Sequence, residues 1–394
     1  MPVYGIPIEK TIMETIRFYQ PKELVFGDHC FKEFSRRSVE LPFKRIFIIA
    51  DPHVIPRLSS WLEILRESGK EFRVFTEVIS EPTVRFFGHI RKEVEGEDYH
   101  AVIGIGGGSV MDTAKLIAAL SYSGQTMEEV YGIGKVAGRA MFLACIPTTA
   151  GTGSEVSPNA VLLDQEENLK KGVVSLFLVP DMAYVDPVLT YSVPPDVSAS
   201  TGIDALTHCL EAYTNKFAHQ LTDLYALEGI RLIAGAIGEV CKNGKNAQAR
   251  ADLALGSLYG GLCLGPVNTA AVHALSYPLG GEYHIAHGIS NAMLLPHVMK
   301  KNLPDAAERY AAIGRVIGAA SCAAPAQQAL ECINIIEKLC RSVGIPDSLK
   351  AYNISRQDVA GLTASAMKVQ RLLKNNLRDL NEEEISEIYM ALVD

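Results

Sequence analysis

The sequence lacks three features that mark other classes of protein: a long apolar segment, a basic block and a cysteine framework. No run approaches the roughly 18 apolar residues of a membrane-spanning helix, and the N-terminal segment mixes charged with apolar side chains, unlike a signal peptide. The net charge of −8 is spread along the chain without a basic cluster, which argues against nucleic acid as a partner. The eight cysteines are scattered and form no CxxC pair, so we expect free, mostly buried thiols. These absences predict a soluble cytoplasmic protein.

What the sequence does contain is enough apolar material for two domains, since the chain has 394 residues and 48% of them are hydrophobic. In the first half, short apolar runs alternate with segments of helical periodicity, which predicts a parallel sheet covered by helices. The expected strands are 45–51, 71–75, 100–105, 141–146, 161–163 and 182–186, and the expected helices include 58–68, 84–95 and 111–120. After Pro187 almost every segment has helical periodicity. We therefore predict an α/β domain over residues 1–192 and an all-helical domain over residues 193–394.

A glycine-rich loop joins the strand at 100–105 to the helix that follows it. The loop reads Gly106-Gly107-Gly108-Ser109, and glycines at such a junction let a phosphate approach the free N–H groups of the helix. The dinucleotide-binding fingerprint is only partly matched, because Ser109 stands where its third glycine belongs. A nucleotide-phosphate site and a plain strand-to-helix turn are both compatible with this loop alone.

A second polar loop follows the strand at 141–146 and reads Thr148-Thr149-Ala150-Gly151-Thr152-Gly153-Ser154-Glu155. Both loops would open at the carboxyl edge of one parallel sheet, where such sheets bind ligands. The hydroxyls of the second loop supply donors for phosphate or ribose, although a flexible linker is the alternative. Asp51 ends the first strand and is either a ribose ligand or an ordinary strand-end acid.

Histidines in the second half indicate a metal site. Asp204 and His208 are four residues apart in an apolar helical segment, so both side chains lie on one helix face. Four more histidines follow within 25 residues of one another, namely His273, His284, His287 and His297. One carboxylate with three imidazoles suits a divalent first-row metal. The spacing does not decide which histidines would take part, nor that Asp204 joins them.

Taken together, the motifs at 106–112, 147–155, 202–208 and 273–288 resemble those of the iron-containing (group III) alcohol dehydrogenase family, in the same order and across nearly the whole chain. The resemblance implies a Rossmann-like α/β domain, an all-helical metal-binding domain and a cleft between them, the fold that this family shares with dehydroquinate synthase. It also implies reversible hydride transfer between a nicotinamide and a small alcohol or aldehyde. Relatives are commonly dimers, so the resemblance implies a homodimer or a larger homo-oligomer.

Individual site residues are implied by the same resemblance. The metal ligands would be Asp204, His208, His273 and His287, with iron(II) usual and zinc used by some members. The expected NAD contacts are Asp51, Gly106, Gly107, Gly108, Ser109, Asp112, Thr148, Thr149, Thr152, Ser157 and Lys170. An acid at Asp51 favours NAD over NADP, because a carboxylate would repel the additional phosphate.

Two positions depart from the family pattern. Tyr277 stands where many relatives have a histidine proposed to relay a proton, and a phenol, with an ordinary pKa of about 10, is a poorer shuttle at neutral pH. Tyr277 either replaces that relay or only shapes the pocket. The second departure lies at Gln370, Arg371 and Leu372, in the stretch expected to line the substrate pocket, where Gln370 replaces an acid. Neutral and basic residues there favour an anionic aldehyde bearing a sulfonate or carboxylate; a solvated basic helix face is the alternative.

The function predicted from the sequence is therefore a metal-dependent, NAD-linked alcohol dehydrogenase or aldehyde reductase, in which the metal acts as a Lewis acid. A zinc-dependent polyol dehydrogenase is an alternative within this class. A lyase similar to dehydroquinate synthase and a non-enzymatic nucleotide or metal sensor are alternatives from other classes. Turnover of an added aldehyde with NADH separates these alternatives from the dehydrogenase.

Overall fold

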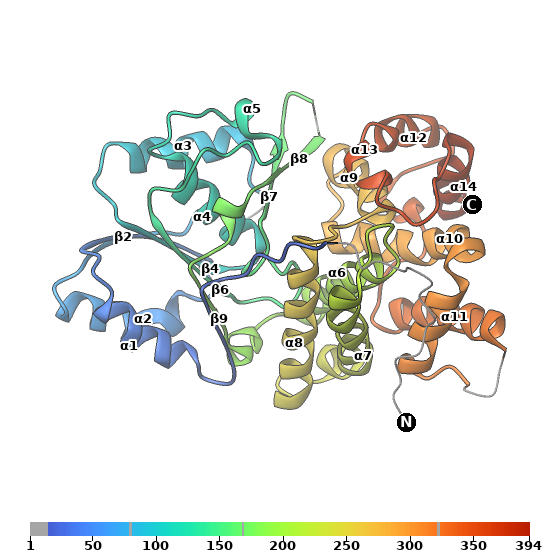
Figure 1. Cartoon of the computed structure of the whole chain (residues 1–394), viewed down its shortest axis with the longest axis horizontal. Helices are drawn as coiled ribbons and strands as arrows, with labels where there is room; N and C mark the ends of the chain where they lie inside the picture. Colours follow the sequence, from blue (N-terminus) through green and yellow to red (C-terminus); the bar gives the residue numbers. More distant parts are fainter. Residues whose placement is uncertain (1–14, 79–80, 168, 321–323) are drawn as a thin grey trace.

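The computed structural model describes residues 15–78, 81–167, 169–320 and 324–394 and shows an α/β part beside a helical part (Figure 1). The α/β part contains β1 (Glu23–Phe26), α1 (Phe31–Glu40), β2 (Arg45–Ala50), α2 (Ile55–Glu67), β3 (Glu71–Phe75), α3 (Val84–Glu95), β4 (Ala101–Gly106), α4 (Gly108–Leu120), α5 (Met127–Val130), β5 (Gly132–Ile133), β6 (Phe142–Pro147), β7 (Asn159–Asp164), β8 (Leu169–Val174) and β9 (Met182–Val185). Six of these strands form one parallel sheet in the order β1-β9-β6-β4-β2-β3. The predicted fold class is thereby confirmed.

Alternating side chains in the central strands build two separate cores, one on each face of the sheet. In β2, Ile46 and Ile48 pack with residues of α1 and α2, whereas Phe47 and Ile49 pack with residues of α3 and α4 on the opposite face (Figure 1). All four side chains are buried, because neighbours along a strand point to opposite faces and helices cover both. The continuous apolar runs of the sequence therefore correspond to strands that are buried on both sides.

The strand order places a topological switch point between β2 and β4. The chain leaves β2 toward β3 on one side and leaves β4 toward β6 on the other. At the carboxyl ends of these two strands Ala50 is paired with Ile105, and the Asp51 amide donates to the Ile105 carbonyl oxygen (2.9 Å). The loops that start at Asp51 and Gly107 diverge from this point. Open α/β sheets bind ligands at such a point, so the topology locates a groove for a cofactor.

Strands β7 and β8 form an antiparallel hairpin outside the parallel sheet. They pair along their whole length and make a three-stranded sheet with β5. The predicted strand at 161–163 is present as β7, but β8 was not predicted, because Leu169–Val174 carries two lysines and a glycine among its apolar residues. The hairpin lies between α4 and helix α9 of the helical part (Figure 1).

The helical part begins after the 3-10 turn Pro187–Thr190. It contains α6 (Pro195–Tyr213), α7 (Gln220–Lys242), α8 (Ala247–Leu264), α9 (Ala271–Tyr283), α10 (His287–Ile317), α11 (Pro325–Ser342), α12 (Val359–Met367), α13 (Gln370–Leu373) and α14 (Glu382–Val393). Helix α6 packs against α7, α8 and α10 and is buried over most of its length, including the face that carries Asp204, His208 and Glu211. The predicted boundary between residues 192 and 193 falls just before α6 and stays a prediction.

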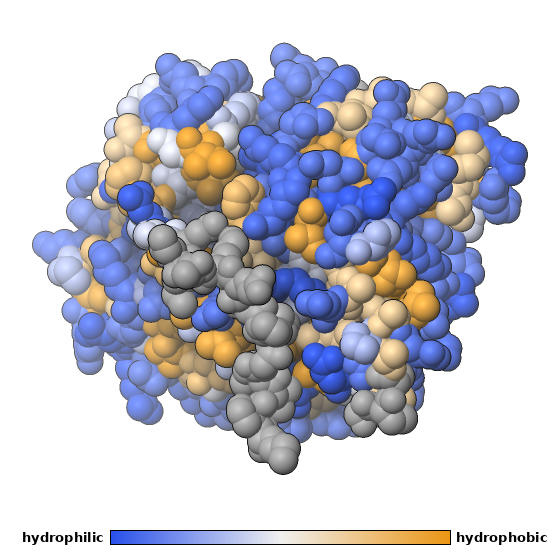
Figure 2. Space-filling model, turned by 45° about the vertical axis from the view of Figure 1, so that its right-hand side comes forward, coloured by the Kyte–Doolittle hydropathy of each residue, from blue (hydrophilic) through white to orange (hydrophobic). Residues whose placement is uncertain are grey.

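The face of the molecule in Figure 2 is mainly hydrophilic, with small apolar patches between charged side chains. Exposed apolar side chains of this kind are ordinary on folded proteins. Among the described residues, no helix is both long enough and apolar enough to cross a membrane.

Candidate active site

The glycine loop and the second polar loop face each other at the carboxyl edge of the sheet. Gly107 is the N-cap of α4, and the helix begins at Gly108. A Cβ atom on Gly108 would lie 2.6 Å from Cγ2 of Thr152, so a larger residue at this position would push the two loops apart. The first N–H groups of α4 have no partner within the helix and are oriented toward an anion at its N-terminus. The two loops therefore have the geometry of a phosphate-binding site.

A groove of about 550 Å³ runs along these loops from Asp51 to the starts of α6 and α10. Its wall on the α/β side includes Asp51, Gly107, Gly108, Ser109, Thr149 and Thr152. Both contacts of Asp51 with His53 use the same carboxylate oxygen, Oδ1, which leaves the other oxygen without a hydrogen bond among the described residues. Gly106 and Thr148 do not line the groove; Gly106 packs against Val110, and the Thr148 amide donates to the Gly106 carbonyl (3.0 Å).

Asp112 and Ser157 hold the second loop and the hairpin in place. The Asp112 carboxylate accepts hydrogen bonds from Ser154 Oγ (2.6 Å) and from the Val161 amide (2.9 Å). The carbonyl oxygen of Ser157 accepts from the buried Lys115 ammonium (2.9 Å). Both residues also line a smaller cavity beside the groove, but their polar groups are largely occupied by the protein itself.

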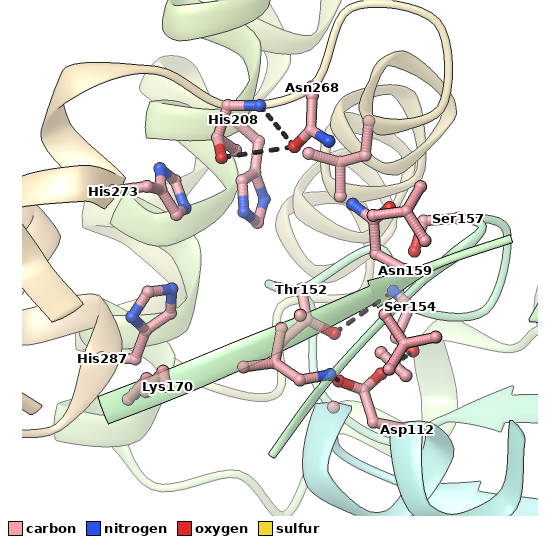
Figure 3. Close-up of a pocket in the computed structure, with 18 of the residues that line it drawn as sticks. Asp112, Thr152, Ser154, Ser157, Asn159, Lys170, His208, Asn268, His273 and His287 are labelled. Atoms are coloured by element: carbon pink, nitrogen blue, oxygen red, sulfur yellow. Dashed lines mark hydrogen bonds between the residues drawn. The ribbon is translucent and has the colours of Figure 1, made fainter. Parts of the chain in front are cut away.

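Lys170 reaches the site from β8 and is almost fully buried. Its ammonium forms an ion pair with Glu81 Oε1 (2.6 Å). The end of its side chain lies against α9 at Gly280, where a Cβ atom would be 2.7 Å from Lys170 Cε. Figure 3 shows Lys170 beside His287. Lys170 therefore connects the hairpin to the helical part at the junction of the groove and the histidines.

Asp204, His208, His273 and His287 come from α6, α9 and α10, and Figure 3 shows the three histidines grouped together. The Nε2 atoms of His208, His273 and His287 lie 3.8, 3.6 and 3.8 Å from Oδ1 of Asp204. A tetrahedral site with metal–ligand distances of about 2.0–2.2 Å has edges of roughly 3.3–3.6 Å. Asp204, His208 and His273 have ligand atoms that lie within 4.8 Å of one another and could hold a divalent metal. His287 is outside that group, although its Nε2 atom is within a few tenths of an ångström of the expected distance from Asp204.

Three of the four groups have the charge states that metal binding requires. At His273, burial is outweighed by Glu211 and Asp204, which raise the pKa of the imidazole to about 9, so a metal would have to displace a proton there. Burial opposes ionisation of Asp204, but His208, His287 and His273 outweigh it and hold the pKa of the carboxyl well below its ordinary value. Burial lowers the pKa of His208, and burial together with the Lys170 charge holds the pKa of His287 well below its ordinary value. At neutral pH the carboxylate is ionised and these two imidazoles are neutral, the forms that bind metals.

Two neighbours of this cluster were not predicted from the sequence. Glu211 accepts a hydrogen bond from Nδ1 of His273 (2.6 Å). Asn291 donates from its amide to Oδ1 of Asp204 (2.7 Å), and the same amide nitrogen lies 3.1 Å from Nε2 of His273. A signal was present for both, because Glu211 is seven residues after Asp204 and Asn291 is four residues after His287, spacings that share one helix face.

Comparisons with known proteins agree with this architecture. Residues 21–187 match the family model "Iron-containing alcohol dehydrogenase", and residues 198–393 match the model "Fe-containing alcohol dehydrogenase family, C-terminal". Long-chain-alcohol dehydrogenase 1 of Geobacillus thermodenitrificans is 38% identical over 354 residues, which cover 88% of this chain and 89% of that protein. The chain belongs to the iron-containing alcohol dehydrogenase family. It is an NAD-dependent alcohol oxidoreductase, which excludes the lyase and the non-enzymatic sensor.

Solved structures of other alcohol dehydrogenases have the same fold. A 1,3-propanediol oxidoreductase superposes with a TM-score of 0.91 at 30% identity, covering 96% of this chain and 99% of that one. Sulfoacetaldehyde reductase from Bifidobacterium kashiwanohense, in complex with NAD+, superposes with a TM-score of 0.85 at 25% identity, with the same coverage.

In this alcohol dehydrogenase, a cavity of about 170 Å³ adjoins the histidines and is lined by Tyr277 and Arg371. Gln370 and Leu372, predicted beside Arg371, do not line it. The Gln370 side chain is exposed and donates to the Met367 carbonyl (2.8 Å), and Leu372 is buried in the helical core. Successive side chains of the short helix α13 project roughly 100° apart, so the three adjacent residues cannot all face one cavity. Of the three predicted substrate residues, Arg371 alone lines this cavity, and a role of Gln370 and Leu372 stays a prediction.

Proposed function

We propose that the chain is a metal-dependent NAD(H) alcohol dehydrogenase or aldehyde reductase that uses iron(II). Its metal ligands would be Asp204, His208, His273 and His287. The observation that carries this proposal is the grouping of three Nε2 atoms at 3.6–3.8 Å around Oδ1 of Asp204, at the end of the groove that starts at the glycine loop. Other divalent metals, zinc among them, fit the same ligands.

The chain's own residues hold the cofactor and exclude water. We propose that the N-terminal amides of α4 bind the pyrophosphate, that Asp51 binds the adenosine ribose, and that Lys170 lies beside the nicotinamide ribose. When bound, the metal supplies Lewis acidity toward the substrate oxygen. In the reducing direction, C4 of NADH gives a hydride to the carbonyl carbon and the oxygen takes up a proton from solvent, which yields NAD+ and the alcohol. The buried side chains of Lys170 and Tyr277 in the cavity wall limit competing water.

Tyr277 would shape the pocket rather than relay protons. Burial raises the pKa of its phenol, and the nearby Arg371 opposes this effect only in part. The phenol therefore stays protonated at neutral pH and can donate a hydrogen bond, but it does not cycle between two protonation states as an imidazole does.

Metal analysis combined with aldehyde turnover tests the proposal. Protein purified without oxygen is expected to contain one divalent metal, to lose NADH-dependent reduction of propionaldehyde when a chelator removes it, and to recover with iron(II). His208→Gln should abolish metal binding, whereas His297→Gln, which changes a histidine outside the cluster on α10, should leave it intact. Full activity without metal would contradict the proposal. Faster turnover of a polyol with zinc than of any aldehyde would favour the polyol dehydrogenase.

We further propose that the substrate is a small aldehyde with an anionic group. Arg371 lines the cavity beside the histidines, and among the described residues no carboxylate forms an ion pair with it. Lys170, the neighbouring cation, is paired with Glu81. A guanidinium without a counter-ion beside a reaction site suits a carboxylate or a sulfonate. The likeness to a sulfoacetaldehyde reductase supports the same substrate class.

Arg371→Gln tests this substrate class. We expect kcat/KM for succinic semialdehyde or sulfoacetaldehyde to fall on the order of 10- to 100-fold, the effect of one hydrogen bond between charged groups, while kcat/KM for propionaldehyde changes little. Lys374→Gln removes a positive charge from an exposed site in the same segment and serves as the control. The substrate proposal fails if the wild-type protein reduces the neutral aldehydes as well as or better than the anionic ones.

We also propose a homodimer or larger homo-oligomer, which rests on the family resemblance, and a cytoplasmic location, which rests on the composition of the sequence. Sedimentation of the purified protein tests the first, and a monomer at working concentrations would contradict it.

A further inference from the structure

The carboxylate of Glu211 lies behind the metal ligands and makes three short contacts with the start of α9. Asp204, His208 and Glu211 follow one another on one face of α6. Glu211 Oε2 accepts from Nδ1 of His273 (2.6 Å) and from the Ala270 amide (2.9 Å), and Oε1 accepts from the Val272 amide (2.6 Å). The side chain is 5% exposed. A buried carboxylate with these donors is held in one orientation.

The contact with Nδ1 determines which nitrogen of His273 faces the metal site. An imidazole that binds a metal through Nε2 carries one proton, and the short hydrogen bond to Glu211 keeps that proton on Nδ1. Nε2 is then unprotonated and lies 3.6 Å from Oδ1 of Asp204, in the position of a ligand. The Asn291 amide nitrogen, 3.1 Å from Nε2, favours the same tautomer, but Glu211 is the partner that accepts the proton on Nδ1.

The two backbone contacts place the turn that carries His273. The N-cap of α9 is Ala270, which has no side chain that could accept the free N–H groups of the first turn. Glu211 supplies that acceptor from α6, through the amides of Ala270 and Val272. The same carboxylate thus fixes the backbone of the turn and the ring of the ligand.

We propose that Glu211 is a positioning residue that sets metal affinity without touching the metal, by fixing the tautomer and orientation of His273. The proposal rests on the proposed metal site. Carboxylates that orient a metal-bound histidine in this way typically contribute 10- to 100-fold to metal affinity.

Glu211→Gln is the variant that tests this role. Glutamine has one acceptor oxygen where glutamate has two, and it carries no charge. It therefore cannot accept from the Ala270 and Val272 amides and from Nδ1 of His273 together, and it holds the Nδ1 proton less firmly. We expect the affinity for Co2+, measured by titration of its visible absorption against a competing chelator, to fall on the order of 10- to 100-fold.

Thr207→Val is the matched control, because it removes a buried hydroxyl from α6 that bonds to the Ile203 carbonyl and has no contact with His273. It should lower thermal stability and leave Co2+ affinity unchanged. Should Glu211→Gln not fold, Glu211→Asp, which keeps the charge but withdraws it by one methylene, should show a smaller loss of affinity. Unchanged affinity in whichever Glu211 variant folds would overturn the role of Glu211 alone. Wild-type protein that binds no Co2+ would overturn the proposed metal site itself.

Discussion

Glu155 is a buried carboxyl whose protonation differs between the folded and the unfolded chain. It ends the second polar loop and is 3% exposed. Burial raises its pKa from the ordinary 4.5 to about 7, and Lys115 on α4 offsets only part of this effect. Between these two values the folded protein keeps a proton that the unfolded chain has lost. This group therefore stabilises the fold most below about pH 4.5, and its contribution is lost as the pH rises to about 7.

The unfolding free energy of the wild type should fall as the pH rises from about 4.5 to about 7. Glu155→Gln keeps the size of the side chain and removes its charge, so we expect a smaller fall in this variant. The difference between wild type and variant should reach up to about 3 kcal/mol across the interval, since one pKa unit corresponds to about 1.4 kcal/mol. Urea unfolding at several pH values from about 5 to about 8 measures it. Glu166→Gln, at an exposed position in the turn between β7 and β8, controls for the loss of one acidic residue. Parallel stability profiles for wild type and Glu155→Gln would contradict this expectation.

The histidines proposed as metal ligands show how much of the site can be predicted from residue spacing. Asp204 and His208 were predicted as a pair because both lie on one helix. His273 and His287 lie in the first turns of two different helices, α9 and α10, and their approach to α6 depends on how the helices pack. His284 is the exposed C-cap of α9, and His297 lies ten residues beyond His287, roughly 15 Å along the same helix. Local spacing therefore could not separate the ligands from their neighbours.

At the scale of elements, the contact between β8 and α9 depends on one glycine. A Cβ atom on Gly280 would lie 2.7 Å from Cε and 3.0 Å from Nζ of Lys170. The end of a lysine side chain is flexible, so it would move aside rather than unfold the helix, and its ion pair with Glu81 would be lost.

Gly280→Ala should therefore raise the KM for NADH, roughly tenfold if one charged hydrogen bond is lost, with little change in unfolding free energy. Alanine favours the helix by up to about 1 kcal/mol, which offsets the cost of moving Lys170. Gly235→Ala, in α7 where a Cβ atom meets nothing, should gain the same helix preference without any effect on KM. Steady-state kinetics with urea unfolding provide both measurements, and an unchanged KM in Gly280→Ala would show that Lys170 does not contact the cofactor.

The strands that were predicted and the strand that was missed differ in which of their side chains are buried. β2, β4 and β6 are buried on both faces, so they appear in the sequence as continuous apolar runs. β8 has only some of its residues buried, and its lysines reach the active site on one side and Glu167 on the other. A strand whose polar side chains serve a site does not show the apolar pattern from which strands are predicted.

At the scale of the whole molecule, the second polar loop belongs to the sheet by sequence but is packed by the helical part. A Cβ atom on Gly151 would lie 2.7 Å from Cβ of Thr201 on α6. Gly153, which has φ +60°, lies close to Gly261 of α8. A Cβ atom on Gly261 would lie 2.6 Å from Cα of Gly153. The loop is thus held between two helices of the other part, and the α/β part cannot keep it in place alone.

Gly261→Ala is expected to weaken both stability and cofactor binding. Its methyl group would meet two backbone atoms of Gly153, which cannot rotate aside, and Cγ2 of Val156. We therefore expect a loss of about 1–3 kcal/mol, as for other overpacked sites. Relief of the clash would move the loop that carries Thr152 opposite Gly108, which should raise the Kd for NADH measured by fluorescence titration. Gly238→Ala adds the same methyl group to α7, where a Cβ atom meets nothing, and should leave the Kd unchanged. If Gly261→Ala matched Gly238→Ala in unfolding free energy and in Kd, the helical part would not hold the loop, and the groove would be a property of the sheet alone.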